Sequence, residues 1–296
     1  MILKAVRDNK IQSYTIIAGF LVIVALFIYF VCYLLDFGIW SVIIAFGFSI
    51  SSCIISYYNC DKLVLAMNGA RPATKEQDLL LTTLLDGLCI ASGLPKPKLY
   101  VINDSCPNAF ATGRNPEHAV ICVTTGLLEK MDKYELEGVL AHELSHIKNY
   151  DILLSTVISV FAGFVVMVSD FVIRYGFRRR SSRNNDDKNP IELIILVIGM
   201  IFVILSPIFT KLIQLAVSRK REYLADSTAI EFTRNPNGLI SALKKLQNDT
   251  SSMQNVSNAT AHMYINNPNK KKREKEDLFS THPPISERIA RLEHIN

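Results

Sequence analysis

Four runs without a charged residue most constrain what this chain can fold into. The first two, Ile16 to Leu35 and Phe37 to Tyr58, are each about 20 residues long, enough for a helix to cross a hydrocarbon core about 30 Å thick. Two slightly shorter runs follow, Ile152 to Ser169 and Leu193 to Thr210. A signal peptide fits the first run poorly, because the run is too long and a second follows at once. With 49% hydrophobic residues, the sequence predicts a mainly α integral membrane protein with four hydrophobic helices.

Positive charges indicate how the first hydrophobic hairpin is oriented. Lys4, Arg7 and Lys10 precede it, and Lys62 and Arg71 follow it, so the positive-inside rule places both of its ends in the cytoplasm. The six cysteines show no paired metal-ligand spacing, which agrees with a setting without structural disulfides. The rule is less decisive for the second pair of runs, because the loop between them is rich in arginine. That pair is read either as two spans or as a partly buried hairpin.

The stretch between the two hydrophobic pairs has the composition of a soluble domain. Thr74 and Gln77 form a capping-box pattern for a helix that runs to about Ser92. Its predicted apolar face consists of Leu79, Leu80, Leu84, Leu85 and Leu88. Strands are predicted at Lys98 to Ile102 and at His118 to Thr124, with Asn108 to Gly113 between them. We therefore expect a small β-sheet within a helical domain.

The motif His142-Glu143-Leu144-Ser145-His146 carries the candidate chemistry. On a helix its two histidines share one face, about 5 to 6 Å apart at Cβ, close enough for both rings to bind one Zn²⁺. Asp132 and Glu135 form a capping-box-like start ahead of the motif, which predicts that helix. The glutamate beside the first histidine is a candidate general base. The alternative is a chance pair of histidines on a polar helix.

Two histidines leave a catalytic zinc site incomplete, because such a site usually has three protein ligands. A metzincin would have glycine and histidine where this chain has Asn149 and Ile152, so that solution is excluded. Glu222 and Asp226 follow the fourth hydrophobic run and lie one helical turn apart. Glu222 is the predicted third metal ligand, and Asp226 is a candidate to orient a ligand histidine. The alternative is an ordinary solvated run of charges beside the membrane.

Three motifs occur along the chain in a characteristic order. They are the HExxH sequence, the segment from Ser218 to Asp226, and Ser280 to Pro284 followed by Glu287 to Ile289. Together they resemble the HtpX family, and the resemblance covers nearly the whole chain. It implies a zincin-like catalytic domain on the cytoplasmic side of the cytoplasmic membrane, a gluzincin protease with one Zn²⁺ per chain. It also implies a role in membrane-protein quality control and a relationship to the CAAX prenyl-protein endopeptidases.

The resemblance adds two candidate residues to the site. His282 is a candidate donor to the oxyanion of the tetrahedral intermediate, and Arg288 is a candidate partner for Asp226. For His282, the alternative is a loop histidine beside the rigid Pro283-Pro284 turn. With zinc held by His142, His146 and Glu222, Glu143 would take the proton of the attacking water and pass it to the leaving amine.

A predicted edge strand beside the metal-binding helix is the candidate substrate site. Its residues are Asn108, Ala109, Phe110, Ala111 and Thr112. Such an edge can pair with an extended peptide through main-chain hydrogen bonds, which suits unfolded polypeptides because it requires little of their sequence. The alternative is a buried core strand, which Phe110 favours.

The segment from residue 248 to 277 is polar and strongly basic near its end. Its positive residues there are Lys270, Lys271, Lys272, Arg273 and Lys275. This composition predicts a solvated surface loop, with attraction to anionic lipid headgroups as the second interpretation. Nucleic acid is not an expected partner, because the net charge is only +5 and membrane topology accounts for many of the positive residues.

These features divide the chain into four expected parts. They are an N-terminal transmembrane hairpin (1–61), a first catalytic part (62–151), a second hydrophobic hairpin (152–217) and a second catalytic part (218–296). The predicted protein is a multi-pass zinc endopeptidase that contacts the bilayer and cleaves misfolded or damaged membrane proteins at the cytoplasmic face. A processing protease of the prenyl-protein endopeptidase type is one alternative, although four hydrophobic segments are few for the chamber implied for those enzymes. A non-catalytic membrane adaptor or transporter is another, and it leaves the complete ligand set unexplained.

Overall fold

The computed structural model describes residues 7–8, 10–19, 57–162, 219–254, 256–257, 259–268 and 283–294, with a few single positions between 22 and 55. Most of the four charge-free runs lies outside the described residues, as do His282 and the lysine-rich stretch at 270–275. Within the described part, helices predominate and accompany one four-stranded sheet. None of the described helices combines the length and the apolar character that a membrane crossing requires.

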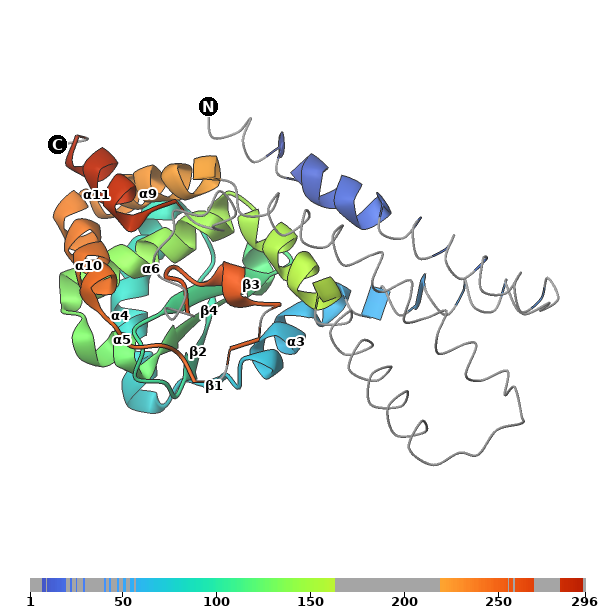
Figure 1. Cartoon of the computed structure of the whole chain (residues 1–296), viewed down its shortest axis with the longest axis horizontal. Helices are drawn as coiled ribbons and strands as arrows, with labels where there is room; N and C mark the ends of the chain where they lie inside the picture. The colour runs from blue at the N-terminus through green and yellow to red at the C-terminus, as the bar shows by residue number, and fades with distance from the viewer. Residues whose placement is uncertain are drawn as a thin grey trace, which may run out of the picture.

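A mixed sheet with the strand order β1-β2-β4-β3 lies at the centre of the described domain (Figure 1). Its strands are β1 (Arg71–Pro72), β2 (Lys98–Ile102), β3 (Ala109–Gly113) and β4 (Ala119–Thr124). The inner strands β2 and β4 are parallel, whereas β1 and β3 pair antiparallel at the two edges. The bounds predicted for β2 are confirmed. β4 begins one residue later than predicted, because Pro116–His118 form the short 3₁₀ helix η1.

The two faces of the sheet belong to different hydrophobic cores, because successive strand residues point to opposite sides. Ala109, Ala111 and Ile121 share one core with the helices α4 (Lys75–Ser92), α6 (Lys133–Lys148) and α10 (Pro236–Asn248). On the other face, Phe110 packs with α3 (Cys60–Met67) and stacks edge-on against Tyr264, with ring centroids 5.0 Å apart. The edge strand β3 therefore lies between α6 and the segment that carries Tyr264.

Helix α4 has the predicted capping box at Thr74 and ends at Gly93, which adopts a left-handed φ of 70°. The predicted apolar face was wrong for Leu79 and Leu80, which are 69% and 45% exposed. The buried stripe consists instead of Leu81, Leu84, Leu85 and Leu88. That stripe keeps the i, i+3, i+4, i+7 spacing of one helix face, and the two earlier leucines lie off it.

Helix α6, which carries the HExxH motif, packs against α10 through two glycines. A Cβ atom on Gly138 would lie 2.7 Å from the Leu239 amide nitrogen, and one on Gly238 would lie 2.5 Å from the Tyr134 carbonyl oxygen. Only glycine fits where two backbones approach this closely. The contact fixes the position of α6 in the domain before any ligand is considered.

The segment of residues 259–268, here called the strap, runs beside β3 and contains the 3₁₀ helix η2 (Ala261–Met263). The expectation of a solvated loop was wrong for this segment. The Asn68 side-chain oxygen accepts hydrogen bonds from Thr260 Oγ1 at 2.7 Å and from the Tyr264 hydroxyl at 3.0 Å, and all three residues are buried. Internal partners thus satisfy the polar groups that made the sequence look like surface, while Tyr264 fills the core.

Candidate metal centre

Helix α6 begins where the sequence predicts and presents its motif toward the interior. The Asp132 carboxylate accepts hydrogen bonds from the amides of Tyr134 and Glu135 at 2.9 Å, and the Glu135 carboxylate accepts one from the Asp132 amide at 2.8 Å. This reciprocal capping box satisfies amides that the first turn leaves without a partner. His142 and Glu143 are almost fully buried further along the helix. Because these two side chains are buried, they are placed to act inside the protein rather than to be solvated at its surface.

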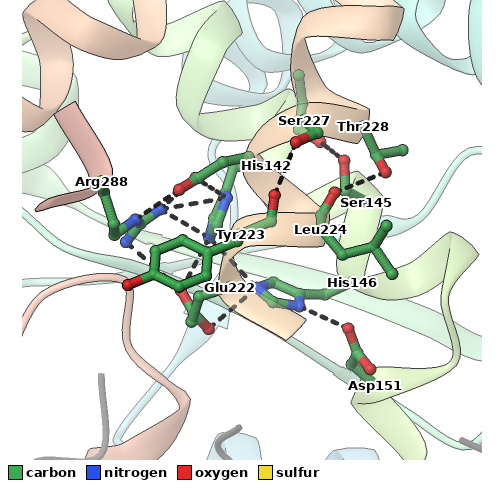
Figure 2. Close-up of polar contacts among 12 residues, drawn as sticks. His142, Ser145, His146, Asp151, Glu222, Tyr223, Leu224, Ser227, Thr228 and Arg288 are labelled. Carbon is green, nitrogen blue, oxygen red and sulfur yellow. Dashed lines mark hydrogen bonds and ion pairs between the residues drawn. The ribbon is translucent and has the colours of Figure 1, made fainter. Parts of the chain in front are cut away.

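Helix α9 (Arg219–Thr233) brings Glu222 to the two histidines (Figure 2). The Nε2 atoms of His142 and His146 are 3.2 Å apart, and each lies 3.6 Å from a carboxylate oxygen of Glu222. Around a tetrahedral ion with bonds of about 2.0 to 2.1 Å, neighbouring ligand atoms are roughly 3.3 Å apart. The ligand atoms of these three residues all lie within 4.8 Å of one another. The spacing and chemistry of the donors therefore fit one metal ion.

A carboxylate holds the outer nitrogen of each histidine ring. His142 Nδ1 lies 3.0 Å from Asp226 Oδ1, and His146 Nδ1 lies 3.0 Å from Asp151 Oδ2. Both carboxylates are buried. A carboxylate on Nδ1 keeps the proton there, turns the Nε2 electron pair toward a cation and raises its basicity. Both rings are thus oriented for ligation by the protein itself.

Helix α11 (Ile285–Glu293) contributes Arg288, whose side chain is completely buried. Its Nε and Nη2 atoms donate to the two oxygens of Asp226 at 2.9 and 2.6 Å, a bidentate ion pair. Its Nη1 atom lies 3.4 Å from Glu222 Oε2. One guanidinium therefore ties the carboxylate behind His142 to the third member of the cluster (Figure 2).

Burial and charge shift the protonation of these groups in different directions. Burial and the nearby Arg288 charge lower the pKa of His142 to about 4, which keeps this ring neutral. Burial also acts to lower the pKa of His146, but the hydrogen bond to Asp151 and the Glu222 charge outweigh it and raise the pKa to about 9. Burial alone would raise the pKa of the Asp226 carboxyl, yet Arg288 holds it below its usual range. The carboxylates around His146 therefore favour a positive charge at this position.

Replacing Arg288 by methionine is expected to lower the free energy of unfolding by roughly 3 to 5 kcal/mol, because the buried Asp226 carboxylate would lose its ion-pair partner. Denaturant unfolding of the purified chain would measure the change. Arg291→Met is the matched control on the same helix, since the Arg291 and Glu287 side chains are exposed and such pairs contribute roughly 0 to 1 kcal/mol. Equal small losses in both variants would contradict a stabilising role for the buried pair.

A small pocket lies beside the cluster. Its lining includes Ala111, Glu143, His146, Glu222, His262 and Met263. Burial raises the pKa of Glu143 to about 7, and a backbone hydrogen bond from Ala111 opposes that shift. A carboxyl group with a pKa near 7 is suited to taking and returning a proton at neutral pH. The general-base candidate therefore lines the same pocket as two members of the cluster, His146 and Glu222.

The predicted substrate strand is both a sheet edge and a buried strand, so each of the two interpretations left open by the sequence holds in part. At one end, the Ala109 carbonyl oxygen accepts a hydrogen bond from the Ile265 amide of the strap at 3.0 Å. At the other end, the Gly113 amide donates to Thr156 Oγ1 at 3.1 Å. Ala111 lies between these two contacts and lines the pocket. A role in substrate binding stays a prediction, with Ala111 as its point of contact.

Two residues of the site were missed by reasoning from the sequence, and one predicted residue lies outside the description. Asp151 had a usable signal, because an acidic side chain directly after the HExxH helix can turn back to the last histidine. His262 had none, since its place in the pocket depends on the packing of the strap. His282 lies outside the described residues, so its predicted role stays a prediction.

Comparisons with known proteins agree with the geometry. Residues 75–296 match peptidase family M48. A protease HtpX homolog from Caldanaerobacter subterraneus is 44% identical over 293 residues, which cover 97% of this chain and 96% of that protein. Another from Listeria monocytogenes is 41% identical over 308 residues and covers both chains completely.

A comparison with solved structures adds a similarity of fold. The crystal structure of Ste24p from S. mikatae is similar with a TM-score of 0.51 and 20% sequence identity, over 98% of this chain and 67% of that one. This likeness shows a shared fold. The family match and the near full-length relatives lead to one conclusion: the chain belongs to peptidase family M48 and is an HtpX-like metalloprotease.

Proposed function

We propose that this chain is a zinc-dependent endopeptidase of the cytoplasmic membrane that hydrolyses misfolded or damaged membrane proteins at the cytoplasmic face. The observation that carries the proposal is the buried cluster of His142, His146 and Glu222, with Glu143 beside it in a pocket. Two imidazoles, one carboxylate and an adjacent general base are the parts of a gluzincin peptidase site.

The residues of the site have different roles in the proposed peptide hydrolysis. A zinc ion held by His142, His146 and Glu222 would supply Lewis acidity toward a water molecule and the substrate carbonyl. Glu143 takes the proton from the attacking water and transfers it to the leaving amine. Asp226 and Asp151 keep the imidazoles in the orientation and tautomer that ligation requires.

Substrate binding in this proposal relies on the main chain. Ala111 belongs to the edge strand beside α6 and lines the pocket together with Glu143, so an extended peptide that lies along β3 passes the general base. The strap covers β3 at Ala109, and Thr156 covers it at Gly113, which limits pairing to a short stretch. A short main-chain contact selects for unfolded backbone more than for sequence. This preference suits damaged substrates.

The membrane setting is inferred from the sequence. The long charge-free runs and the positive residues that flank the first pair support an anchored protein with its catalytic part on the cytoplasmic side. An anchored peptidase meets membrane proteins at the surface where their cytoplasmic segments emerge. The two inferences, unfolded backbone and membrane proximity, together define the proposed substrate class.

The test compares two substrates with the full-length chain purified in chelator and reloaded with zinc. An unfolded membrane protein should be cut, the cut should stop with chelator and return with zinc, and the folded form of that protein should resist. A prenylated C-terminal peptide is the second substrate. Cleavage of that peptide alone would replace the proposal by a specific processing protease, and a zinc-loaded chain that cuts neither substrate would contradict the endopeptidase function.

A further inference from the structure

The helical residues 10–19 contact two residues that lie next to the metal centre, Tyr150 and Arg221. Within residues 10–19, which are helical, Lys10 Nζ lies 3.8 Å from the centre of the Tyr150 ring, a cation–π contact. Gln12 Oε1 accepts a hydrogen bond from Arg221 Nη2. Ser13, on the same helix, has no exposed surface. Lys10 and Gln12, two polar residues at the start of a predominantly apolar segment, thus face the catalytic domain.

These contacts reach the turn that follows the HExxH helix. Tyr150 separates α6 from the helical residues 151–162 and has a left-handed φ of 59°, a conformation that is costly for a residue other than glycine. Such a conformation persists only where the surroundings hold it. The Lys10 ammonium group lies over the Tyr150 ring and supplies one such constraint.

The same turn positions the carboxylate that holds His146. Asp151 follows Tyr150 directly, with Oδ2 3.0 Å from His146 Nδ1 and Oδ1 3.7 Å from Arg221 Nε. The Arg221 guanidinium in turn donates to Gln12. A continuous path of contacts therefore runs from the N-terminal helix through Arg221 and Asp151 to a member of the metal cluster.

We propose that Lys10 and Gln12 form a brace that fixes the Tyr150-Asp151 turn and thereby positions His146 for metal binding. They are positioning residues, because Lys10 acts through Tyr150 and Gln12 through Arg221, and both lie outside the pocket lining. The inference rests on the proposed function, in that His146 is taken as a zinc ligand. It assigns to the N-terminal segment a role in metal affinity that is separate from anchoring.

The brace has a consequence for zinc affinity that substitution can measure. Loss of a partner that orients a metal ligand lowers affinity by roughly 10- to 100-fold, and the brace acts one contact further out. We expect Lys10→Met combined with Gln12→Leu to raise the zinc Kd about tenfold, at the lower end of that range. Gln12→Glu alone keeps an acceptor for Arg221 and should retain the wild-type Kd.

The experiment uses the full-length chain and two readouts. Competition with a chelator gives the zinc Kd, and amide hydrogen exchange of a peptide spanning residues 148–153 reports on the turn without any metal. Ile11→Ala is the matched control, because Ile11 lies between the two brace residues yet is 57% exposed. Glu143→Gln serves as a second reference, since it removes the proposed base and should leave both readouts unchanged.

The outcomes separate the brace from the proposed function. A raised Kd with faster exchange in the double variant, and neither change in Ile11→Ala or Gln12→Glu, supports the brace. Wild-type Kd and exchange in the double variant overturn it, as do equal losses in Gln12→Glu and the double variant. If the wild type itself fails to bind zinc, the proposed function fails, and the exchange data still report whether the N-terminal helix orders the turn.

Discussion

Replacing Glu143 by glutamine is expected to reduce peptide cleavage by roughly 10²- to 10⁴-fold, the range attributed to a positioned general acid or base. Glutamine keeps the size of the side chain and loses the ability to take a proton from water. Zinc content should stay at the wild-type level, because Glu143 is not a member of the three-residue cluster. Single-turnover cleavage of an unfolded substrate and metal analysis of the same sample would measure both quantities.

The matched control for this variant is Glu137→Gln, the same substitution on the same helix at a half-buried position away from the pocket. It should cleave at the wild-type rate. Cleavage that persists in Glu143→Gln would remove Glu143 from the role of base. A parallel loss of zinc would instead mean that the residue maintains the site, and the rate alone could not then be assigned to proton transfer.

Replacing Glu222 by glutamine is expected to weaken zinc binding by at least roughly 100-fold, the upper end of what loss of an orienting partner costs, because a direct ligand is removed. Only two imidazoles would remain where a catalytic zinc ion usually has three protein ligands. Cleavage should fall with metal occupancy. Chelator competition gives the affinity, and activity measured at rising zinc concentration shows how far occupancy restores the rate.

Glu231→Gln, at an exposed position of the same helix, is the control and should bind zinc as the wild type does. A Glu222 variant with unchanged affinity would show that the third ligand lies elsewhere. Because Arg288 Nη1 lies 3.4 Å from Glu222, a stability measurement must accompany the zinc titration. A folded variant with weak zinc binding identifies a ligand, whereas an unfolded one does not.

Local signals predicted those parts of the molecule that depend on neighbouring residues. The capping boxes at Thr74 and Asp132 mark helix starts that the structure confirms, because capping uses groups only three residues apart. The i, i+4 spacing also predicted that the two histidines of the HExxH motif share one helix face, and that Glu222 and Asp226 share a face of another helix. The prediction that these two helices meet came from the number of ligands that a catalytic metal ion requires, and not from any local pattern.

Contacts between distant segments could not be predicted in this way. The strap was expected to be solvated because its composition is polar. Its partners Asn68 and Ala109 lie far away in the sequence, and no local pattern predicts these contacts. Gln12 and Arg221 are 209 residues apart in the sequence, so the helical period of either segment cannot predict their contact. Leu79 and Leu80 were assigned to the wrong side of α4 for a different reason. The helical period that joins Leu81 to Leu84, Leu85 and Leu88 leaves both of them off the buried stripe.

The division of the site between α6, α9 and α11 also has a consequence for biosynthesis. Arg288 lies 146 residues after His142 and almost at the end of the chain. At synthesis rates of about 5 to 20 residues per second, roughly 7 to 30 seconds pass between the two on the ribosome. Throughout that interval the newly made polypeptide holds its HExxH helix without the guanidinium that secures Asp226. In the proposed mechanism, full organisation of the site therefore waits until Arg288 has been translated, 146 residues after His142.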